Sequence, residues 1–397
     1  MSASWTQLML RPVLPEAARR NPLEQCVDWT VLTSALLLLG IGLVMIASAS
    51  VGIAERQTGD ATYYLTRQLL YVGMGLSFAW VTWRIPLSVW ERLGPVMIIA
   101  SLLLLIVLFI PGVGRSVNGA TRWLQLGPFN LQVSELVKLS VIVYLAGYLV
   151  RRGDEVRTTV GGFLKPMALV MILAVLVLRQ PDFGATVVLG GIALGMMFLG
   201  GVRIWLFGVL VLMTFGAMAL LAISSPYRME RLTAFLNPWA DPFNSGFQLT
   251  QALIAFGRGE WFGVGLGASV QKLFYLPEAH TDFVYAVLAE ELGTFGASMV
   301  VLLFVVLVAR IFTIGRSAAE AGFGFGAHLC YGVALWFAIQ AFINMGVNMG
   351  LLPTKGLTLP LMSYGGSSIV VMCAAIAMVL RVALETPRRG VSQRRAT

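Results

Sequence analysis

The sequence of 397 residues contains few charged residues, and this shortage limits the class of protein it can encode. Charged types make up 12% of the chain and hydrophobic types 58%, whereas about a quarter of the residues in a soluble domain are charged. A soluble enzyme and a disordered chain are therefore both excluded. The mean hydropathy of +0.82 is typical of a membrane protein with many apolar segments.

Cysteine and histidine are also scarce. The three cysteines, Cys26, Cys330 and Cys373, are scattered along the chain, so they form neither a disulfide framework nor a metal-ligand spacing. The two histidines, His280 and His328, are too few for a zinc site of the His-rich kind. A disulfide-stapled secreted domain is thus excluded, and we expect the cysteines to be small apolar fillers.

Long apolar runs are what the chain has in excess. A membrane-spanning helix needs about 20 mostly apolar residues. Because the runs are continuous rather than alternating, they predict helices and exclude a barrel. We expect an all-α polytopic membrane protein with ten transmembrane helices, over residues 31–52, 65–83, 93–110, 133–150, 163–178, 183–201, 204–223, 284–311, 326–350 and 368–384.

The distribution of Lys and Arg predicts the orientation of these spans. With both termini in the cytoplasm, the cytoplasmic segments hold 17 of the 28 basic and 8 of the 19 acidic residues, and thus the whole net charge of +9. The positive-inside rule expects this asymmetry. We divide the chain into a cytoplasmic tail over 1–30, a membrane domain over 31–384 and a basic cytoplasmic tail over 385–397. We interpret the basic tail as a topology anchor and expect no nucleic-acid binding.

One loop on the predicted outer side is unusually long. Residues 224–283 separate spans seven and eight, whereas most loops are a few residues long. The middle of this loop, 247–256, predicts a short amphipathic helix at the membrane interface. Five glycines within 257–267 predict a turning loop, and the stretch lacks the pattern of a phosphate-binding loop. We expect two shorter outer segments, 111–132 and 350–367, to be ordered.

Ionisable residues at membrane depth are costly and are therefore candidates for function. Glu135 and Lys138 are three residues apart and share a helix face. Either the two charges neutralise each other, or Lys138 faces a cavity and meets an anionic group while Glu135 holds it. Asp182 lies in a tight turn between Pro181 and Gly184, where it could cap the next helix.

The stretch from His280 to Glu291 is the richest in polar residues. Asp282 lies where the long loop re-enters the membrane, so its carboxylate is either a general base or, with Thr281, a cap for span eight. Glu290 and Glu291 lie about two turns deeper and cannot face the same direction. At least one of them therefore needs a partner inside the bundle.

Six stretches together resemble one family. They are Asn118-Gly-Ala-Thr-Arg-Trp123, Gln132-Val-Ser-Glu-Leu-Val-Lys138, Gln180-Pro-Asp-Phe-Gly184, Asn237-Pro-Trp-Ala-Asp-Pro242, Ala279-His-Thr-Asp-Phe-Val-Tyr-Ala-Val-Leu-Ala-Glu-Glu-Leu-Gly293 and Leu352-Pro-Thr-Lys-Gly-Leu-Thr-Leu-Pro-Leu-Met-Ser-Tyr-Gly-Gly-Ser-Ser368. Over residues 31–384 the chain resembles the SEDS family (shape, elongation, division and sporulation). The stretch 348–357 resembles the cell-division branch more than the elongation branch. Val133 departs from the family's usual Pro, at a helix start that tolerates either residue.

The resemblance implies a peptidoglycan glycosyltransferase that polymerises lipid II at the outer face of a bacterial cytoplasmic membrane, concentrated at the division septum. It implies that Asp282 is the general base for the acceptor 4-hydroxyl and that undecaprenyl pyrophosphate is the leaving group. No organic cofactor is expected, and a divalent cation (Mg²⁺ or Mn²⁺) could meet the pyrophosphate. The implied partners are lipid II, the nascent glycan strand, other division proteins and a class B penicillin-binding protein docked by its membrane helix near spans eight and nine.

The expected site is assembled from several segments. The residues expected to bind substrate or to support the site are Arg122, Gln132, Ser134, Glu135, Lys138, Asp182, Arg258, His280, Lys355, Ser363, Gly365, Gly366, Ser367 and Ser368, with Glu290 and Glu291 as supporting acids. Two other functions stay open. A lipid II flippase would use the deeper acids in a path across the membrane, and a non-catalytic division scaffold would tolerate Asn at position 282.

Overall fold

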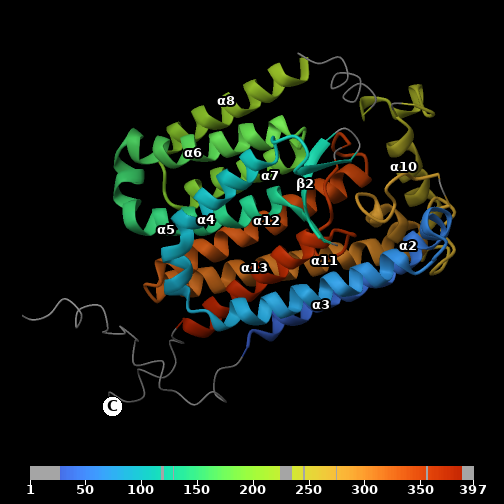
Figure 1. Ribbon diagram of the computed structural model, residues 1–397, viewed down its shortest axis with the longest axis horizontal. Helices are drawn as coiled ribbons and strands as arrows, with labels where there is room; N and C mark the ends of the chain where they lie inside the picture. The colour runs from blue at the N-terminus through green and yellow to red at the C-terminus, as the bar shows by residue number, and fades with distance from the viewer. Residues whose placement is uncertain are drawn as a thin grey trace, which may run out of the picture.

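The computed structural model describes residues 27–117, 120–127, 129–223, 235–244, 246–273, 275–354 and 356–386. In these residues, long helices lie side by side, with a small sheet and a short helix at one end (Figure 1). A helix overlaps most of each predicted span: α2 (Trp29–Thr58), α3 (Tyr63–Arg84), α4 (Leu87–Val107), α5 (Val133–Thr158), α6 (Val160–Arg179), α7 (Phe183–Leu199), α8 (Ile204–Ile223), α11 (Val284–Glu320), α12 (Gly324–Asn348) and α13 (Gly366–Glu385).

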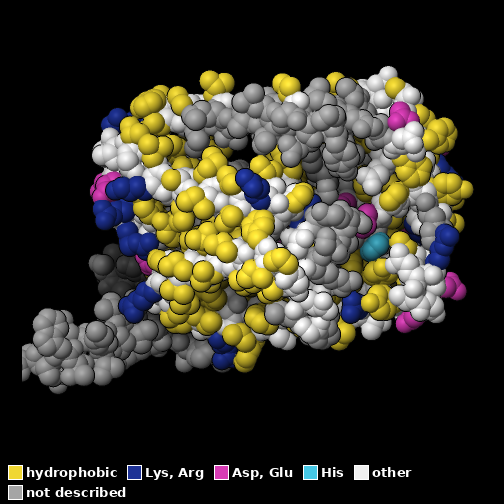
Figure 2. Space-filling view, turned by 45° about the horizontal axis from the view of Figure 1, so that its top comes forward, with side chains coloured by type: hydrophobic (Ala, Val, Ile, Leu, Met, Phe, Trp, Pro, Cys, Tyr) yellow, Lys and Arg dark blue, Asp and Glu magenta, His cyan; other side chains and the backbone are white. Residues whose placement is uncertain are grey.

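The prediction of an all-α polytopic bundle is confirmed, whereas the count of ten spans stays a prediction. Among the described residues, seven helices are long and apolar enough to cross a membrane. The seven helices do not include α3, the 17-residue α7 or α8. Figure 2 shows hydrophobic side chains spread over the visible face of the bundle, as a lipid-exposed surface requires.

Helix ends follow local sequence signals. Asp28 precedes α2, and its Oδ1 accepts a hydrogen bond from the backbone N–H of Val31 at 3.2 Å, while the helix ends at the left-handed Gly59. Thr159 caps α6 in the same way, through a 3.0 Å bond from the N–H of Gly162. These are the residue types that satisfy free backbone groups at helix starts and ends.

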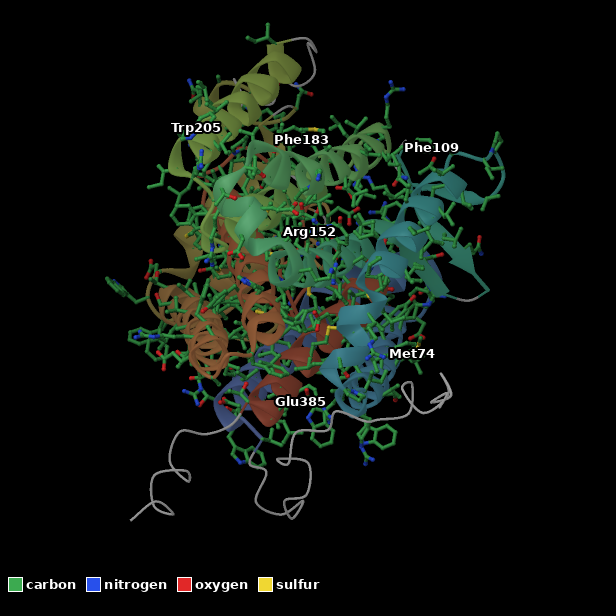
Figure 3. All side chains as sticks on the ribbon, turned by 90° about the vertical axis from the view of Figure 1, so that its left-hand side faces the viewer. Met74, Phe109, Arg152, Phe183, Trp205 and Glu385 are labelled. Atoms are coloured by element: carbon green, nitrogen blue, oxygen red, sulfur yellow. The ribbon has the colours of Figure 1, made fainter. Side chains whose placement is uncertain are left out.

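The centre of the bundle is formed by α5, α12 and α13, which are buried over most of their apolar length. By contrast, α4 and α11 expose most of their apolar residues at the perimeter. Seen from the left-hand end of Figure 1, α8 with Trp205 lies at the opposite edge from Met74 of α3 (Figure 3).

The eighth predicted span is longer than expected and is interrupted. The helix α11 runs from Val284 to Glu320, and Gly293 breaks it with φ 67° and ψ −171°. A Cβ at position 293 would lie 2.4 Å from the backbone N of Gly263, so only glycine fits there. Backbone bonds from Val264 to the carbonyl of Glu290, at 3.0 Å, and from Thr294 to the carbonyl of Glu260, at 2.9 Å, tie the long loop to this break.

The long loop contains the predicted short helix, α10 (Phe247–Gly259), preceded by the 3₁₀ turn η3 (Pro238–Ala240). Its apolar face, with Leu249, Ala252 and Ala255 buried, packs toward α11. The predicted turning loop over 257–267 begins later than expected, because Gly257 and Gly259 still belong to α10, and the residues after the helix turn with positive φ angles at Gly263, Gly265 and Gly267. Placement of α10 at the membrane interface stays a prediction.

The segment over 111–132 was expected to be ordered, and its described residues form a sheet that the sequence patterns did not indicate. Three antiparallel strands run in the order β1 (Gly114–Val117), β2 (Ala120–Leu126) and β3 (Phe129–Gln132). The helix α5 begins at the next residue, Val133. The sheet and α10 lie at what we call the loop end of the bundle, opposite the terminal end, where α13 finishes at Glu385 (Figures 1 and 3).

Several predictions fall on residues outside the described part of the chain. Residues 1–26 and 387–397 make up most of the two predicted tails. Lys355, predicted to bind substrate, is also outside the described residues. The division of the chain into tails and a membrane domain therefore stays a prediction.

Candidate active site

A polar cavity of about 660 Å³ opens at the loop end of the bundle. Its walls come from the sheet, from the starts of α3, α5 and α7, from the residues just before α11 and from the segment that leads into α13. Its lining includes four carboxylates and two guanidinium groups, those of Glu135, Asp182, Glu278, Asp282, Arg67 and Arg122.

The cavity gathers about half of the residues predicted for the site. Of these residues, the lining includes Arg122, Gln132, Glu135, Asp182, Asp282, Gly365, Gly366 and Ser367. The described residues of the predicted set that do not line it are Ser134, Lys138, Arg258, His280, Glu290, Glu291, Ser363 and Ser368.

Asp282 lies immediately before α11, and the helix-cap interpretation of its side chain is wrong. The cap position is Phe283 and no side chain caps from there. Instead, the first turn of α11 is capped from another helix, because Oδ1 of Asn348 accepts a 3.1 Å bond from the N–H of Ala286. No hydrogen bond or ion pair joins the Asp282 carboxylate to another described residue, so its oxygens are available to the cavity.

The backbone of Asp282 is held by two buried asparagines of α12, which the sequence patterns did not indicate. The Nδ2 groups of Asn344 and Asn348 donate to the carbonyl of Asp282 at 2.9 and 3.0 Å. Asn344 also donates to the carbonyl of Leu357 at 2.5 Å. Next to Leu357, Gly356 leaves room for the carboxylate, since a Cβ there would lie 3.0 Å from Oδ2 of Asp282. The sequence signal for this pair was the spacing of four residues between Asn344 and Asn348, which places both amides on one face of a helix.

Burial raises the pKa of the Asp282 carboxyl to about 7, from an ordinary value of 3.8. The negative charges of Glu278 and Asp182 act in the same direction, while the guanidinium group of Arg122 opposes them. A carboxyl group with a pKa near the working pH is ionised in about half of the molecules, and its conjugate acid is weak enough for the carboxylate to accept a proton in a reaction.

Asp182 has both a structural role and a place in the cavity. Its Oδ1 accepts a 3.1 Å bond from the N–H of Ala185, so the predicted cap of the next helix is confirmed. Its Oδ2 accepts bonds from the hydroxyl of Ser134, at 3.2 Å, and from the side-chain amide of Gln132, at 3.4 Å. Asp182 therefore joins the start of α7 to the junction of β3 and α5.

Two arginines supply positive charge to the cavity. Arg122, on β2, donates to the carbonyls of Gln180 at 3.2 Å and of Pro181 at 2.5 Å, which fixes its guanidinium group against the turn before α7. Arg67, on α3, lies over the ring of Tyr63 at 5.1 Å. Sequence reasoning missed Arg67, although an arginine in the first turn of a predicted span was a signal for it.

Glu135 and Lys138 form the neutralising pair, and Lys138 does not face the cavity. The two charged groups are 2.8 Å apart, and both side chains are almost completely buried. The Lys138 ammonium group also donates to Oε1 of Gln340 at 2.7 Å and lies 5.0 Å from the ring centre of Trp336. Glu135 lines the cavity, with Lys138 behind it. Oε2 of Glu135 is buried and has no partner among the described residues.

Glu290 and Glu291 lie outside the cavity, and both are fully buried with partners. Glu290 accepts bonds from the hydroxyl of Ser269 and from two backbone N–H groups of the same loop, and Arg258 lies 3.5 Å away. Glu291 pairs with Lys272 at 2.8 Å and accepts a 2.6 Å bond from Ser48 of α2. Both acids thus fasten the long loop to the bundle, and the expectation of an internal partner is confirmed for both.

The remaining predicted residues pack around the cavity wall. His280 is buried between the rings of Tyr64 and Tyr364, and burial lowers its pKa. Ser363 accepts a 2.8 Å bond from the N–H of Leu359, which closes a tight turn. Ser368 is buried in the first turn of α13. Within the cavity, Ser367 accepts a 2.9 Å bond from the N–H of Gln132, linking α13 to the sheet.

The described residues contain no group of three or more His, Cys, Asp or Glu arranged to hold a metal ion. The donors at hand are the four carboxylates of the cavity lining. Mg²⁺ is usually held by one or two protein carboxylates together with substrate phosphates and water. The residues present therefore fit an ion that is shared with a bound phosphate.

The fold and the cavity define a polytopic helical membrane protein with a polar, carboxylate-bearing site at one end of its bundle. The chain matches the family of FtsW, RodA and SpoVE, described as cell cycle proteins, over residues 28–388. It belongs to this family, in agreement with the resemblance of its motifs, and is a multi-pass membrane protein.

Relatives with high identity are named for one branch of that family. The chain is 59% identical to the probable peptidoglycan glycosyltransferase FtsW of Nitrosococcus halophilus, over 92% of this chain and 95% of the relative. It is 60% identical to the protein of the same name from Thioalkalivibrio sulfidiphilus, over 93% and 92% of the two chains. The predicted resemblance to the cell-division branch agrees with these names.

Solved structures with the same fold extend the comparison. A chain from a peptidoglycan synthase complex that coordinates polymerisation and crosslinking has a TM-score of 0.73 and 30% identity, over 90% of this chain and 98% of that one. The rod shape determining protein RodA of Thermus thermophilus has a TM-score of 0.69 and 28% identity, over 92% of this chain and all of that one.

Proposed function

We propose that the protein is a peptidoglycan glycosyltransferase that polymerises lipid II, with Asp282 as the general base. The observation that carries this proposal is the Asp282 carboxylate, which faces the polar cavity without a partner among the described residues. Its pKa of about 7 suits proton transfer near neutral pH. The names of the high-identity relatives support the same activity.

In the proposed reaction, Asp282 accepts the proton of the acceptor 4-hydroxyl as that oxygen attacks the anomeric carbon of the donor sugar. The bond from that carbon to undecaprenyl pyrophosphate breaks on the opposite face, so the configuration inverts. A positioned base contributes about 10² to 10⁴ in rate to such a step. The two asparagines that hold the Asp282 backbone would fix the base relative to the hydroxyl.

The leaving pyrophosphate needs positive charge, and Arg67 and Arg122 are the cavity's guanidinium groups among the described residues. Arg122 is preorganised by its two carbonyl contacts, so it could bind phosphate with little loss of side-chain freedom. Lys355 is proposed to add to this charge. A Mg²⁺ or Mn²⁺ ion between the pyrophosphate and one or two cavity carboxylates would supply further charge. Activity that persists in excess chelator would remove the ion from this proposal.

We propose that the protein acts at the division septum, with both termini cytoplasmic and the cavity on the outer face. The proposed partners are the nascent glycan strand, a class B penicillin-binding protein and other division proteins. The structural similarity to a chain of a peptidoglycan synthase complex supports the class B penicillin-binding protein as a partner. The distribution of Lys and Arg supports the orientation.

The test is polymerisation of labelled lipid II by the purified wild type and by Asp282→Asn, each with a penicillin-binding partner. The amide keeps the size of the side chain but cannot accept the proton, so we expect a loss of about 100-fold or more. Co-purification of the partner with the variant is the control for folding. Polymer from Asp282→Asn at the wild-type rate would remove Asp282 from the chemistry.

The same preparation discriminates between the proposal and the two other functions. A flippase would move labelled lipid II between the leaflets of a vesicle without forming polymer, and a scaffold would do neither. Polymer made by the wild type but not by Asp282→Asn is expected only of the glycosyltransferase.

A further inference from the structure

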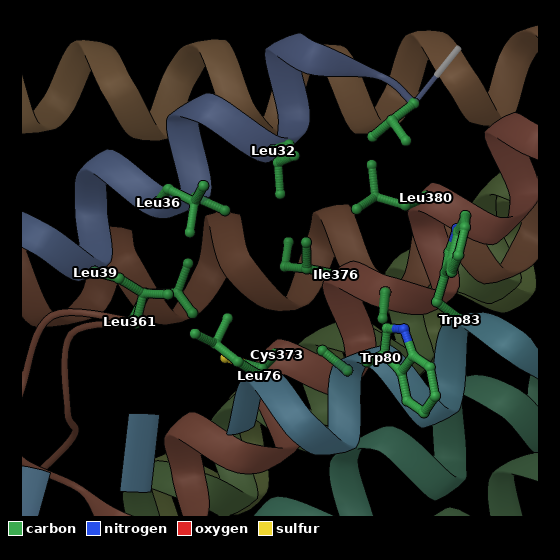
Figure 4. Close-up of a pocket in the computed structure, with 14 residues that line it drawn as sticks. Leu32, Leu36, Leu39, Leu76, Trp80, Trp83, Leu361, Cys373, Ile376 and Leu380 are labelled. Carbon is green, nitrogen blue, oxygen red and sulfur yellow. The ribbon is translucent and has the colours of Figure 1, made fainter. Parts of the chain in front are cut away.

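A second hollow, of about 300 Å³, lies between α2, α3 and α13 and differs from the cavity in chemistry. We call it the lateral groove. Its lining is apolar and aromatic, and none of its lining residues is charged. Figure 4 shows side chains from all three helices directed into it, among them Leu36, Leu39, Leu76, Trp80, Ile376 and Leu380.

The lateral groove runs along the helices. On α3 its lining residues extend from Leu76 to Trp83, two turns of helix and thus about 10 Å. Leu36, Leu76 and Trp80 are about half exposed, so the groove is open to the surroundings of the bundle. A channel with this direction and this opening is parallel to the acyl chains of a surrounding bilayer.

The lateral groove is closed on the side of the active-site cavity. Leu361 forms its inner end and is almost fully buried. Beside it, α2 packs directly on the chain, because a Cβ at Gly42 would lie 2.6 Å from the Cα of Met362. The groove is therefore separate from the polar cavity, and its open length reaches toward the terminal end of the bundle.

A positive charge lies at the terminal end of the groove. The guanidinium carbon of Arg84 is 4.7 Å from the ring centre of Trp80 and 5.9 Å from that of Trp83, both of which line the groove. Arg84 is exposed and has no ion pair with a described residue. The neighbouring Arg381 is already paired with Glu385 at 2.6 Å. Among the described residues, Arg84 thus provides an uncompensated positive charge at the groove.

We propose that the lateral groove binds an anionic phospholipid, with one acyl chain in the groove and the headgroup phosphate on Arg84. The distribution of Lys and Arg predicts that the terminal end faces the cytoplasmic leaflet, whose anionic lipids attract basic side chains. Trp80 and Trp83 have the amphipathic rings that favour the level of the headgroups. The charge of Arg84 selects an anionic lipid over a zwitterionic one.

The test is native mass spectrometry of the full chain in detergent, with added phosphatidylglycerol or phosphatidylethanolamine of identical acyl chains. The wild type should retain one phosphatidylglycerol in preference to phosphatidylethanolamine. Arg84→Gln should reduce this preference about five-fold, as expected for one basic residue at an anionic surface. Arg92→Gln, which changes an exposed arginine outside the groove lining, is the matched control and should keep the preference.

Filling the groove tests the acyl-chain part of the proposal. Ala79→Phe and Leu36→Trp each place a larger side chain in the lining, so both should lose the retained phosphatidylglycerol while keeping the wild-type unfolding temperature in lipid-free detergent. Two groove-filling variants are used so that, if one of them misfolds, the other still tests whether the acyl chain occupies the groove.

Four results would overturn the proposal. They are equal retention of the two lipids by the wild type, an unchanged preference in Arg84→Gln, unchanged retention in both groove-filling variants, and displacement of phosphatidylglycerol by undecaprenyl phosphate. The last result would assign the groove to a substrate tail. Loss of polymerisation is not a readout here, so failure of this proposal is separate from failure of the proposed enzyme.

Discussion

Asp282, just before α11, and Glu290, within that helix, are carboxylates eight residues apart whose surroundings differ. Glu290 is completely buried, accepts three hydrogen bonds and lies near Arg258. Asp282 faces the cavity, and its carboxylate has no partner among the described residues. The carboxylate of Glu290 thus fastens a loop, whereas the carboxylate of Asp282 is a candidate for catalysis. The saturation of their oxygens by hydrogen-bond donors distinguishes the two carboxylates.

Replacing each acid by its amide should change stability in opposite directions. The pKa of Asp282 is raised from 3.8 to about 7, so its charge destabilises the fold, in part above about pH 4 and fully above about pH 7. Asp282→Asn should therefore raise the unfolding temperature at pH 8. Glu290→Gln should lower the free energy of unfolding by about 2 kcal/mol, because a charged acceptor with several donors is lost.

Thermal unfolding in detergent at pH 8 and pH 5 measures both effects. The gain from Asp282→Asn should shrink at pH 5, where the carboxyl of the folded wild type is already protonated. Polymerisation by Glu290→Gln should be far less reduced than by Asp282→Asn. A lower unfolding temperature for Asp282→Asn, or a gain that is the same at both pH values, would contradict the comparison.

The positioning of Asp282 by α12 should have a smaller effect on rate than the loss of the carboxylate itself. Asn344→Leu removes the amide that donates to the carbonyls of Asp282 and Leu357 but keeps the side chain's approximate volume. We expect kcat for polymerisation to fall about ten-fold with KM nearly unchanged, because misplacing a reacting group costs rate rather than binding.

Steady-state kinetics with lipid II separates these two parameters. A merely structural role for Asn344 would lower the amount of folded enzyme, and kcat per folded molecule would then match that of the wild type. That outcome, or a rise in KM alone, would remove Asn344 from the positioning of the base.

The smallest effect is expected from Glu278, an exposed carboxylate of the cavity lining. Activity should rise with pH through about 7, as Asp282 loses its proton. Glu278 helps to raise that pKa, so Glu278→Gln should move the midpoint of the pH–rate profile to lower pH, by less than about one unit because solvent screens the charge.

The pH dependence of kcat/KM for polymerisation provides the measurement. Glu260→Gln, an exposed acid of the same loop that does not line the cavity, is the matched control and should leave the midpoint unchanged. A midpoint that moves upward in Glu278→Gln would reverse the assigned sign of this charge.

The sequence indicated the bundle because its signals are local. A run of about 20 apolar residues predicts a span wherever it occurs, so a helix overlaps most of each predicted range. Cap residues are local as well, and the predicted cap at Asp182 is confirmed. The sheet over 114–132 was not foreseen, because its short strands lack the alternation that marks a strand in a longer run.

The site could be predicted only in part, because its residues come together through contacts between distant segments. The motifs in the sequence predicted that Arg122, Asp182 and Asp282 belong to one site, and all three line the cavity. No local pattern, however, distinguished a general base from a helix cap at position 282. Asn344 and Asn348 are polar residues in an apolar run, and only their contact with Asp282 gives them a role. In the same way, only packing places Lys138 behind Glu135.

The sequence by itself determined a polytopic helical membrane protein, since apolar length and the placement of charge set the solvent in which the chain folds. It also determined the residue types that the site would draw on. Only the tertiary structure decided which carboxylates are saturated by partners and which one faces a cavity. The reason is physical, because hydrogen-bond partners, burial and the resulting pKa of Asp282 depend on segments that meet only in the folded chain.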